Sequence, residues 1–147
     1  MILADEAKTH AVGQALAKVL RRGDIIALYG DLGAGKTSLA RGLLSGLGLS
    51  EDAPSPSFPL VIPYEPPLVS LPVWHVDLYR LDRPEQVVEL GLEEALLDGA
   101  LIIEWPDRLG AALWPDALKL YLEPEEKGGR RLTADVPPSW EGRCPIR

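Results

Sequence analysis

The residues with the clearest potential for chemistry are the eight from Gly30 to Thr37, which read GDLGAGKT. They follow the apolar run Ile25–Tyr29, which predicts a buried strand, and they precede a predicted helix. The pattern G-x-x-x-x-G-K-[ST] in this setting is typical of a phosphate-binding loop, because glycines let backbone N–H groups converge on phosphate oxygens. The Lys36 ammonium can reach the β- and γ-phosphates, and the Thr37 hydroxyl can join the coordination shell of Mg²⁺. The alternative interpretation is a glycine-rich turn without a ligand.

The nucleotide predicted for this loop is ATP rather than GTP. Guanine-specific folds of this kind usually carry an N/T-K-x-D segment that binds the base, and the sequence contains none. A D-x-x-G match at Asp107–Gly110 follows the wrong element to serve as a GTPase switch. We therefore expect an adenine nucleotide.

A second group of polar residues lies in the segment Val73–Arg80. Strand alternation sends His75, Asp77 and Tyr79 to one face and the apolar residues between them to the other. Beside a phosphate-binding loop, this face predicts a lined site in which Asp77 holds Mg²⁺ directly or through water. The alternatives are a solvated strand face with an Asp77–Arg80 ion pair and a purely structural histidine.

Glu104 ends the apolar run Ala100–Glu104, which predicts another buried strand. Ligands of open α/β sheets bind beyond the carboxyl ends of the strands, so Glu104 is placed to act on the metal or on the attacking water. A chance charge at a strand end is the alternative. Trp105, which follows, fits either the core or an exposed docking surface.

The elements that must position these residues follow from hydrophobic periodicity and from glycine and proline. Apolar spacing in residues 6–21 predicts a helix that ends at Gly23, and Gly91 weakens the helix expected over residues 84–97. The prolines of Glu51–Phe58 predict a loop. We expect one domain over residues 1–136 and a poorly ordered tail over 137–147. The predicted helices span residues 6–21, 36–47 and 84–97, and the predicted strands span 25–29, 60–64, 71–79, 100–104, 117–123 and 131–136.

Composition narrows the classes of function. The chain has 147 residues and a formal net charge of −7, which argues against an autonomous grip on nucleic acid. No apolar run approaches the roughly 20 residues of a membrane span, and the N-terminal residues lack a secretory signal pattern. The single cysteine, Cys144, fits a reducing compartment, so we expect a cytoplasmic protein.

Five motifs in this order resemble one family. They are the phosphate-binding loop, S-P-S-F at Ser55–Phe58, H-x-D-L-Y-R-L at His75–Leu81, L-G-L-E-E at Leu90–Glu94 and I-E-W-P at Ile103–Pro106. Together they resemble the TsaE (formerly YjeE) family, the small bacterial ATPases of tRNA threonylcarbamoyladenosine synthesis, over about residues 5–135. The resemblance implies an α/β fold: a single-domain P-loop NTPase with a mixed, mainly parallel central sheet flanked by helices.

The resemblance also implies an activity and partners. It implies Mg²⁺-dependent ATP hydrolysis alongside TsaB and TsaD, which install the threonylcarbamoyl group on the adenosine next to the anticodon in tRNAs that read codons beginning with adenine. We expect tRNA to be reached only through these partners, and no membrane to be involved. The nucleotide site expected from the loop and the resemblance comprises Thr9, Leu32, Gly33, Ala34, Gly35, Lys36, Thr37, Ser38 and Arg130 (or Arg131), with Lys36, Asp77 and Glu104 in catalytic roles and Thr37, Asp77 and Glu104 at Mg²⁺.

Two features bear on how far the resemblance extends. The family loop usually reads S-P-T-F, and Ser57 replaces the threonine while keeping a hydroxyl.

Arg41 and Arg80 are both expected to point away from the γ-phosphate, so we expect slow hydrolysis by the chain alone. Two other functions stay open at this point, namely a small-molecule kinase and a nucleotide-gated binding module that does not hydrolyse ATP.

Overall fold

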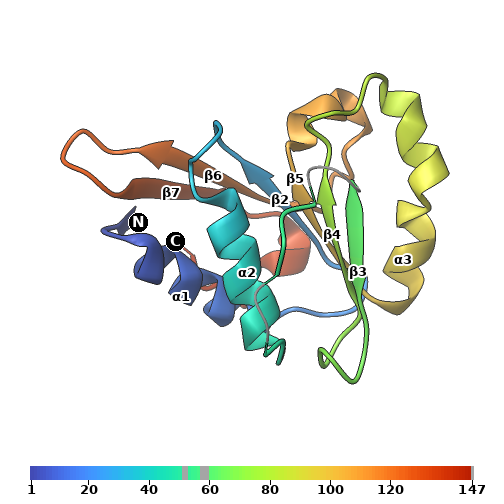
Figure 1. The fold of residues 1–147 in the computed structure, drawn as a ribbon, viewed down its shortest axis with the longest axis horizontal. Helices are drawn as coiled ribbons and strands as arrows, with labels where there is room; N and C mark the ends of the chain where they lie inside the picture. The colour runs from blue at the N-terminus through green and yellow to red at the C-terminus, as the bar shows by residue number, and fades with distance from the viewer. Residues whose placement is uncertain (51–52, 57–59, 147) are drawn as a thin grey trace.

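The computed structural model, which describes residues 1–50, 53–56 and 60–146, contains a seven-stranded sheet in the order β1-β7-β6-β2-β5-β4-β3. Helices α1 and α2 cover one face of the sheet, and α3 packs on the other (Figure 1). The strands are β1 Ile2–Leu3, β2 Ile25–Tyr29, β3 Val61–Tyr64, β4 Val73–Asp77, β5 Ala100–Glu104, β6 Leu118–Pro124 and β7 Arg130–Asp135. The α-helices are α1 Glu6–Ala17, α2 Lys36–Gly46 and α3 Leu92–Asp98, and the 3₁₀ helices are η1 Pro84–Leu90, η2 Pro106–Arg108, η3 Gly110–Ala112 and η4 Pro138–Trp140.

The four central strands, β6, β2, β5 and β4, run parallel, and the antiparallel pairs lie toward the edges. The mixed α/β fold predicted from the sequence is therefore confirmed. Parallel strands end at the same edge of a sheet, so the loop after β2 lies beside the last residues of β4 and β5. The register pairs Leu28 with Glu104 and Asp77 with Glu104, which sets the two carboxylates next to each other.

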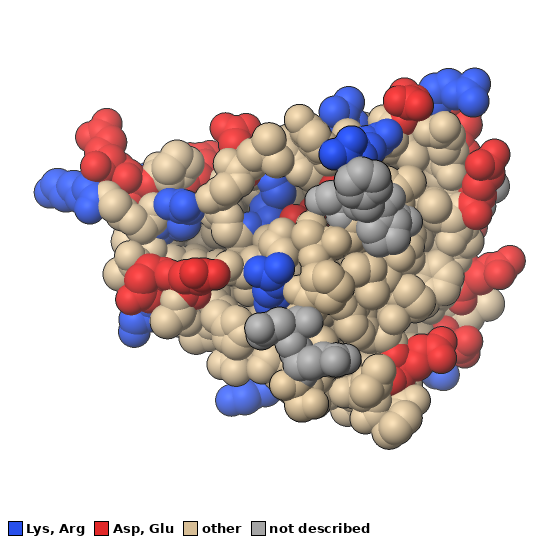
Figure 2. All heavy atoms as spheres, in the orientation of Figure 1, with Lys and Arg blue, Asp and Glu red and all other residues tan. Residues whose placement is uncertain are grey.

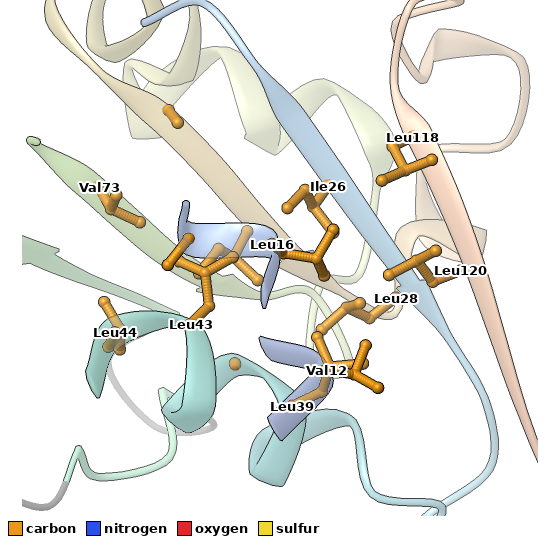
Figure 3. Packing of buried hydrophobic residues seen from close by; sticks show 14 of the residues in the cluster. Val12, Leu16, Ile26, Leu28, Leu39, Leu43, Leu44, Val73, Leu118 and Leu120 are labelled. Atoms are coloured by element: carbon orange, nitrogen blue, oxygen red, sulfur yellow. The ribbon is translucent and has the colours of Figure 1, made fainter. Parts of the chain in front are cut away.

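The larger hydrophobic core lies between the sheet and the pair α1 and α2. Leu16, Leu39 and Leu43 of the helices pack toward Ile26 and Leu28 of β2 (Figure 3). All five side chains are fully buried, so each contributes its whole apolar surface to the stability of the core. This core anchors the helix that starts with Lys36 and Thr37.

The backbones of helices α1 and α2 lie in direct contact at two glycines. A Cβ added to Gly13 would lie 2.2 Å from the Leu39 carbonyl oxygen, and one added to Gly42 would lie 2.1 Å from the His10 carbonyl oxygen. Neither separation is physically possible, so only glycine allows the two backbones to come this close. The contact holds the N-terminal half of α1 beside the phosphate-binding loop.

Two predicted helices differ from the observed elements. Helix α1 ends at Ala17 rather than at residue 21, because the backbone beyond it finds other partners: the Arg21 N–H donates to Asp24 Oδ2 at 2.6 Å, and Arg143 donates to the Val19 carbonyl. The helix expected over residues 84–97 is divided by Gly91, whose φ of 71° is left-handed and breaks the α-helical path between η1 and α3. The short strand β1 was not predicted.

Residues 137–146 pack against the domain, which corrects the expectation of a poorly ordered tail. The Trp140 side chain is fully buried in the larger core. The Arg143 guanidinium lies 3.9 Å from the Trp140 ring centroid and donates two hydrogen bonds of 2.7 Å to the Asp24 carboxylate. Trp140, Ile146 and the Arg143–Asp24 pair fix this segment, and such isolated residues leave no periodic pattern in a sequence.

Within the described residues, no helix has both the length and the apolar character required to cross a bilayer. The Ser57 position of the S-P-S-F motif lies outside the described residues, as do Phe58 and Pro59.

Candidate nucleotide site

A pocket of about 560 Å³ opens at the carboxyl edge of the parallel strands, between the phosphate-binding loop and the start of α1. Figure 2 shows basic and acidic atoms together inside a hollow on this face of the molecule. The pocket brings together every residue that the sequence analysis assigned to the site: Thr9, Leu32, Gly33, Ala34, Gly35, Lys36, Thr37, Ser38, Asp77, Glu104 and Arg130. Its dimensions and its mixture of charges suit a polyphosphate ligand.

The phosphate-binding loop presents the start of α2 to this pocket. Gly33 and Gly35 adopt left-handed conformations, with φ values of 79° and 104°. Gly35 is the N-cap of α2, and no side chain caps the helix there. The first N–H groups of a helix have no partners within it, so they can donate to an anion at this end, where the helix dipole is positive.

Lys36 is held inside the loop and is almost fully buried. Its Nζ donates to the Gly30 carbonyl and, at 3.2 Å, to the Asp31 carbonyl. The ammonium also lies 3.9 Å from the centre of the Trp105 ring, which is a cation–π distance. Burial lowers the pKa of Lys36, and the negative charges of Glu104 and Asp77 oppose that shift. The Lys36 ammonium is therefore hydrogen-bonded by carbonyls and lies near two carboxylates. Phosphate oxygens could replace the carbonyls as its partners.

Glu104 contacts two other elements through its two carboxylate oxygens. Thr37 donates from Oγ1 to Glu104 Oε1 at 3.0 Å, which joins the start of α2 to the end of β5. His75 Nε2 lies 2.6 Å from Glu104 Oε2. Asp77, the register partner of Glu104, accepts a hydrogen bond of 2.9 Å from the Tyr79 N–H. The predicted alternation is confirmed for His75 and Asp77, which share the face of β4 that α1 and α2 cover, but Tyr79 lies beyond the end of the strand and is exposed.

These oxygens are chemically suited to Mg²⁺, which prefers hard oxygen ligands and commonly takes one or two carboxylates together with substrate phosphates. Thr37, Asp77 and Glu104 line one pocket and supply such oxygens. Among the described residues there is no cluster of three or more His, Cys, Asp or Glu side chains able to hold a metal alone. The oxygens of Thr37, Asp77 and Glu104 therefore fit a hard divalent cation.

Arg130 resolves an ambiguity that the sequence left open. From the start of β7, its Nε donates to the Ala34 carbonyl at 3.0 Å and its Nη2 to the Gly33 carbonyl at 2.8 Å. Arg131 instead pairs with Glu125 at 2.6 Å on the surface. Of the two arginines, Arg130 lines the pocket and Arg131 does not.

The family follows from a match along most of the chain. The model of "Threonylcarbamoyl adenosine biosynthesis protein TsaE" matches residues 3–132. The chain belongs to the TsaE family. This membership connects the chain with tRNA threonylcarbamoyladenosine biosynthesis, and it confirms the resemblance carried by the five motifs.

Curated TsaE proteins show the same relationship. The protein from Rickettsia felis is 38% identical over 124 residues, which cover 84% of this chain and 71% of that protein. The Nostoc protein is 40% identical over 74% of this chain and 68% of its own length, and the Streptomyces coelicolor protein is 39% identical over 76% of each. The crystal structure of YdiB from Bacillus subtilis superposes with a TM-score of 0.80 at 28% identity, covering 95% of this chain and 86% of that one.

Within this TsaE site, the structure also places residues that the sequence analysis did not assign. Asp5 and Glu6 line the pocket from the start of α1, and Glu6 accepts a 2.7 Å hydrogen bond from the Ser38 hydroxyl. Asp5 is the N-cap of α1, a position that its sequence setting before an amphipathic helix could have indicated. Trp105 lines the pocket in a left-handed conformation, with a φ of 59°, and is half-buried against the hydrophobic cluster that includes Ile103 and Leu109.

Arg41 and Arg80, which the sequence analysis expected to point away from the γ-phosphate, do not line the pocket. Arg41 donates from Nε to the Ala53 carbonyl at 2.7 Å, and Arg80 is exposed beyond the end of β4. Thr9 does line it, as a buried residue whose hydroxyl donates to the Asp5 carbonyl at 3.4 Å.

Proposed function

We propose that this TsaE-family chain is a Mg²⁺-dependent ATPase that acts with TsaB and TsaD in forming threonylcarbamoyladenosine on tRNA. The observation that carries the proposal is the hydrogen bond of 3.0 Å between Thr37 Oγ1 and Glu104 Oε1. It joins a phosphate-binding loop to a strand-end carboxylate in one pocket, which is the pairing of parts that P-loop NTPases use to hold a nucleotide and its metal.

ATP binding would rest on the loop and on Lys36. Backbone N–H groups at the start of α2 donate to phosphate oxygens, and the Lys36 ammonium exchanges its carbonyl partners for the β- and γ-phosphates. Arg130 holds the loop in shape through the Gly33 and Ala34 carbonyls. Thr9 and Ser38 also line the pocket.

Turnover would depend on the carboxylates. Thr37, Asp77 and Glu104 would hold Mg²⁺ together with the phosphates of ATP, and the ion would supply positive charge to the phosphate oxygens. Glu104, fixed by hydrogen bonds on both of its oxygens, then orients the attacking water. Among the described residues, no arginine other than Arg130 lines the pocket, and its guanidinium is already committed to loop carbonyls. Hydrolysis by the chain alone is therefore expected to be slow.

Partners would supply what the chain lacks. A net charge of −7 disfavours direct tRNA binding, so we propose that tRNA is reached through TsaB and TsaD. We also propose a cytoplasmic location, which the single cysteine supports.

The test is steady-state ATP turnover by the chain alone, then with TsaB and TsaD from the same source, with and without tRNA and Mg²⁺. We expect slow hydrolysis that requires Mg²⁺ and rises when the partners are added. Rapid turnover by the chain alone that no addition changes would refute the role of the partners. Absence of hydrolysis in every mixture would refute the ATPase.

A further inference from the structure

His75 is a fully buried polar residue in the middle of strand β4. Its register neighbours are Ile62 on β3 and Ile102 on β5, both of which are apolar. It does not line the nucleotide pocket. A polar ring in such surroundings is costly unless a hydrogen bond compensates for the loss of water.

That compensation comes from Glu104 alone among the described residues. Nε2 of His75 lies 2.6 Å from Glu104 Oε2, while Nδ1 is buried and has no hydrogen-bond partner within the part of the chain that the structure describes. An ionised carboxylate can only accept, so with Glu104 in that form Nε2 carries the hydrogen of this short bond. The ring is thus oriented by one contact, and that contact is to a residue of the nucleotide site.

Glu104 accepts hydrogen bonds from both His75 and Thr37. The Thr37 hydroxyl lies 3.0 Å from Oε1 and 3.3 Å from Oε2, and His75 Nε2 lies 2.6 Å from Oε2, so the carboxylate is held by one side chain of α2 and one of β4. A glutamate side chain has three rotatable bonds and considerable rotamer entropy when free. Two donors in fixed positions leave it a single orientation toward the pocket.

We propose that His75 is a positioning residue whose Nε2–H fixes the Glu104 carboxylate in the orientation that turnover needs. This inference rests on the proposed function, since it assigns His75 a role through Glu104 in the same site. The alternative is a residue that merely fills space between β3 and β5. The two roles differ because positioning depends on a donor at one atom, whereas packing depends on volume.

The first test needs neither nucleotide nor metal. ¹⁵N NMR of the chain labelled at histidine should show Nε2 protonated and Nδ1 unprotonated for His75. The chain has two histidines, and a His10→Gln variant assigns the signals. A hydrogen on Nδ1 with Nε2 bare would overturn the proposal, because the ring could not then donate to Glu104.

The second test uses a matched pair of variants. The side-chain amide nitrogen of glutamine reaches about as far as Nε2 of histidine, and that of asparagine only as far as Nδ1. In the complex with TsaB, TsaD and tRNA, we expect His75→Asn to lower kcat about 10- to 100-fold, the usual effect of losing a residue that orients a ligand-holding side chain. His75→Gln should stay within about threefold of the parent, and neither variant should change MgATP affinity in calorimetry by more than about threefold.

The outcomes separate this inference from the proposed function. Equal kcat values for both variants, whether retained or lost, would overturn the positioning role, since a donor at the right atom would then make no difference. If the parent chain hydrolyses no ATP in any mixture, the proposed ATPase fails instead, and the tautomer measured by NMR still decides whether His75 donates to Glu104. If His75→Asn does not fold, the ¹⁵N NMR measurement on the unmutated His75 still tests the proposal.

Discussion

Asp77 and Glu104 are register partners at the carboxyl ends of the parallel strands β4 and β5. Two carboxylates so placed repel each other unless a cation lies near them. The buried ammonium of Lys36 responds to both, since each opposes the lowering of its pKa that burial causes. The pair is therefore a site that favours positive charge, and its two members can be distinguished by mutation.

We expect Glu104→Ala to reduce kcat on the order of 100-fold while weakening MgATP binding much less. The loop and Lys36 would still hold the phosphates, but the Thr37 hydroxyl would lose its acceptor and the water its organiser. Single-turnover hydrolysis and calorimetry measure the two effects separately. Asp77→Asn is the matched comparison, and a larger loss of kcat there than in Glu104→Ala would move the main catalytic role to Asp77.

Lys36→Ala should weaken MgATP binding by at least about 100-fold, or about 2.8 kcal/mol at 1.4 kcal/mol per factor of ten. In the proposed function, the Lys36 ammonium, which now contacts the Gly30 carbonyl and the Trp105 ring, would bind the triphosphate. Titration calorimetry is the measurement, and circular dichroism confirms that the fold survives. Lys127→Ala, at an exposed position in the β6–β7 turn, is the control and should bind like the parent. Normal affinity in the Lys36 variant would contradict the phosphate-binding interpretation.

Arg130→Ala and Arg131→Ala form a pair of adjacent substitutions with different expected results. Loss of Arg130 removes the donors to the Gly33 and Ala34 carbonyls and should weaken MgATP binding about tenfold. Loss of Arg131 breaks an exposed ion pair with Glu125 and should change affinity by less than about twofold. Calorimetry compares the two, and equal effects would show that Arg130 does not support the loop.

Trp140→Ala should lower the free energy of unfolding by about 3–5 kcal/mol, because it leaves a cavity in the larger core. Equilibrium unfolding in urea measures the loss. Trp140→Phe keeps an aromatic ring beneath the Arg143 guanidinium and should cost less. A change of under about 1 kcal/mol in the alanine variant would mean that residues 137–146 do not pack as described.

The parts of the site that the sequence predicted are those governed by local rules. The strand Ala100–Glu104 was predicted with its observed bounds because a buried parallel strand reads as one apolar run. Lys36 and Thr37 follow from a motif whose spacing is set by phosphate geometry. The common face of His75 and Asp77 follows from alternation, which holds along any extended strand.

The parts that escaped prediction depend on contacts between distant residues. Arg130 and Arg131 are adjacent, and only the register of β7 against β6 decides which one reaches the loop. Trp105 adopts a left-handed conformation that sequence preference disfavours, and it is held between Lys36 and Tyr79. The bond from His75 to Glu104 requires the pairing of β4 with β5 to be known first.

The glycine contact between α1 and α2 couples the positions of the two helices. Backbone meets backbone at Gly13 and Gly42, so no layer of pliable side chains lies between the helices there to absorb a shift. Since α2 begins at Lys36 and Thr37, any displacement of that helix by arriving phosphates must carry α1 with it. Through this contact, the positions of the pocket-lining residues of α1 and those of α2 depend on each other.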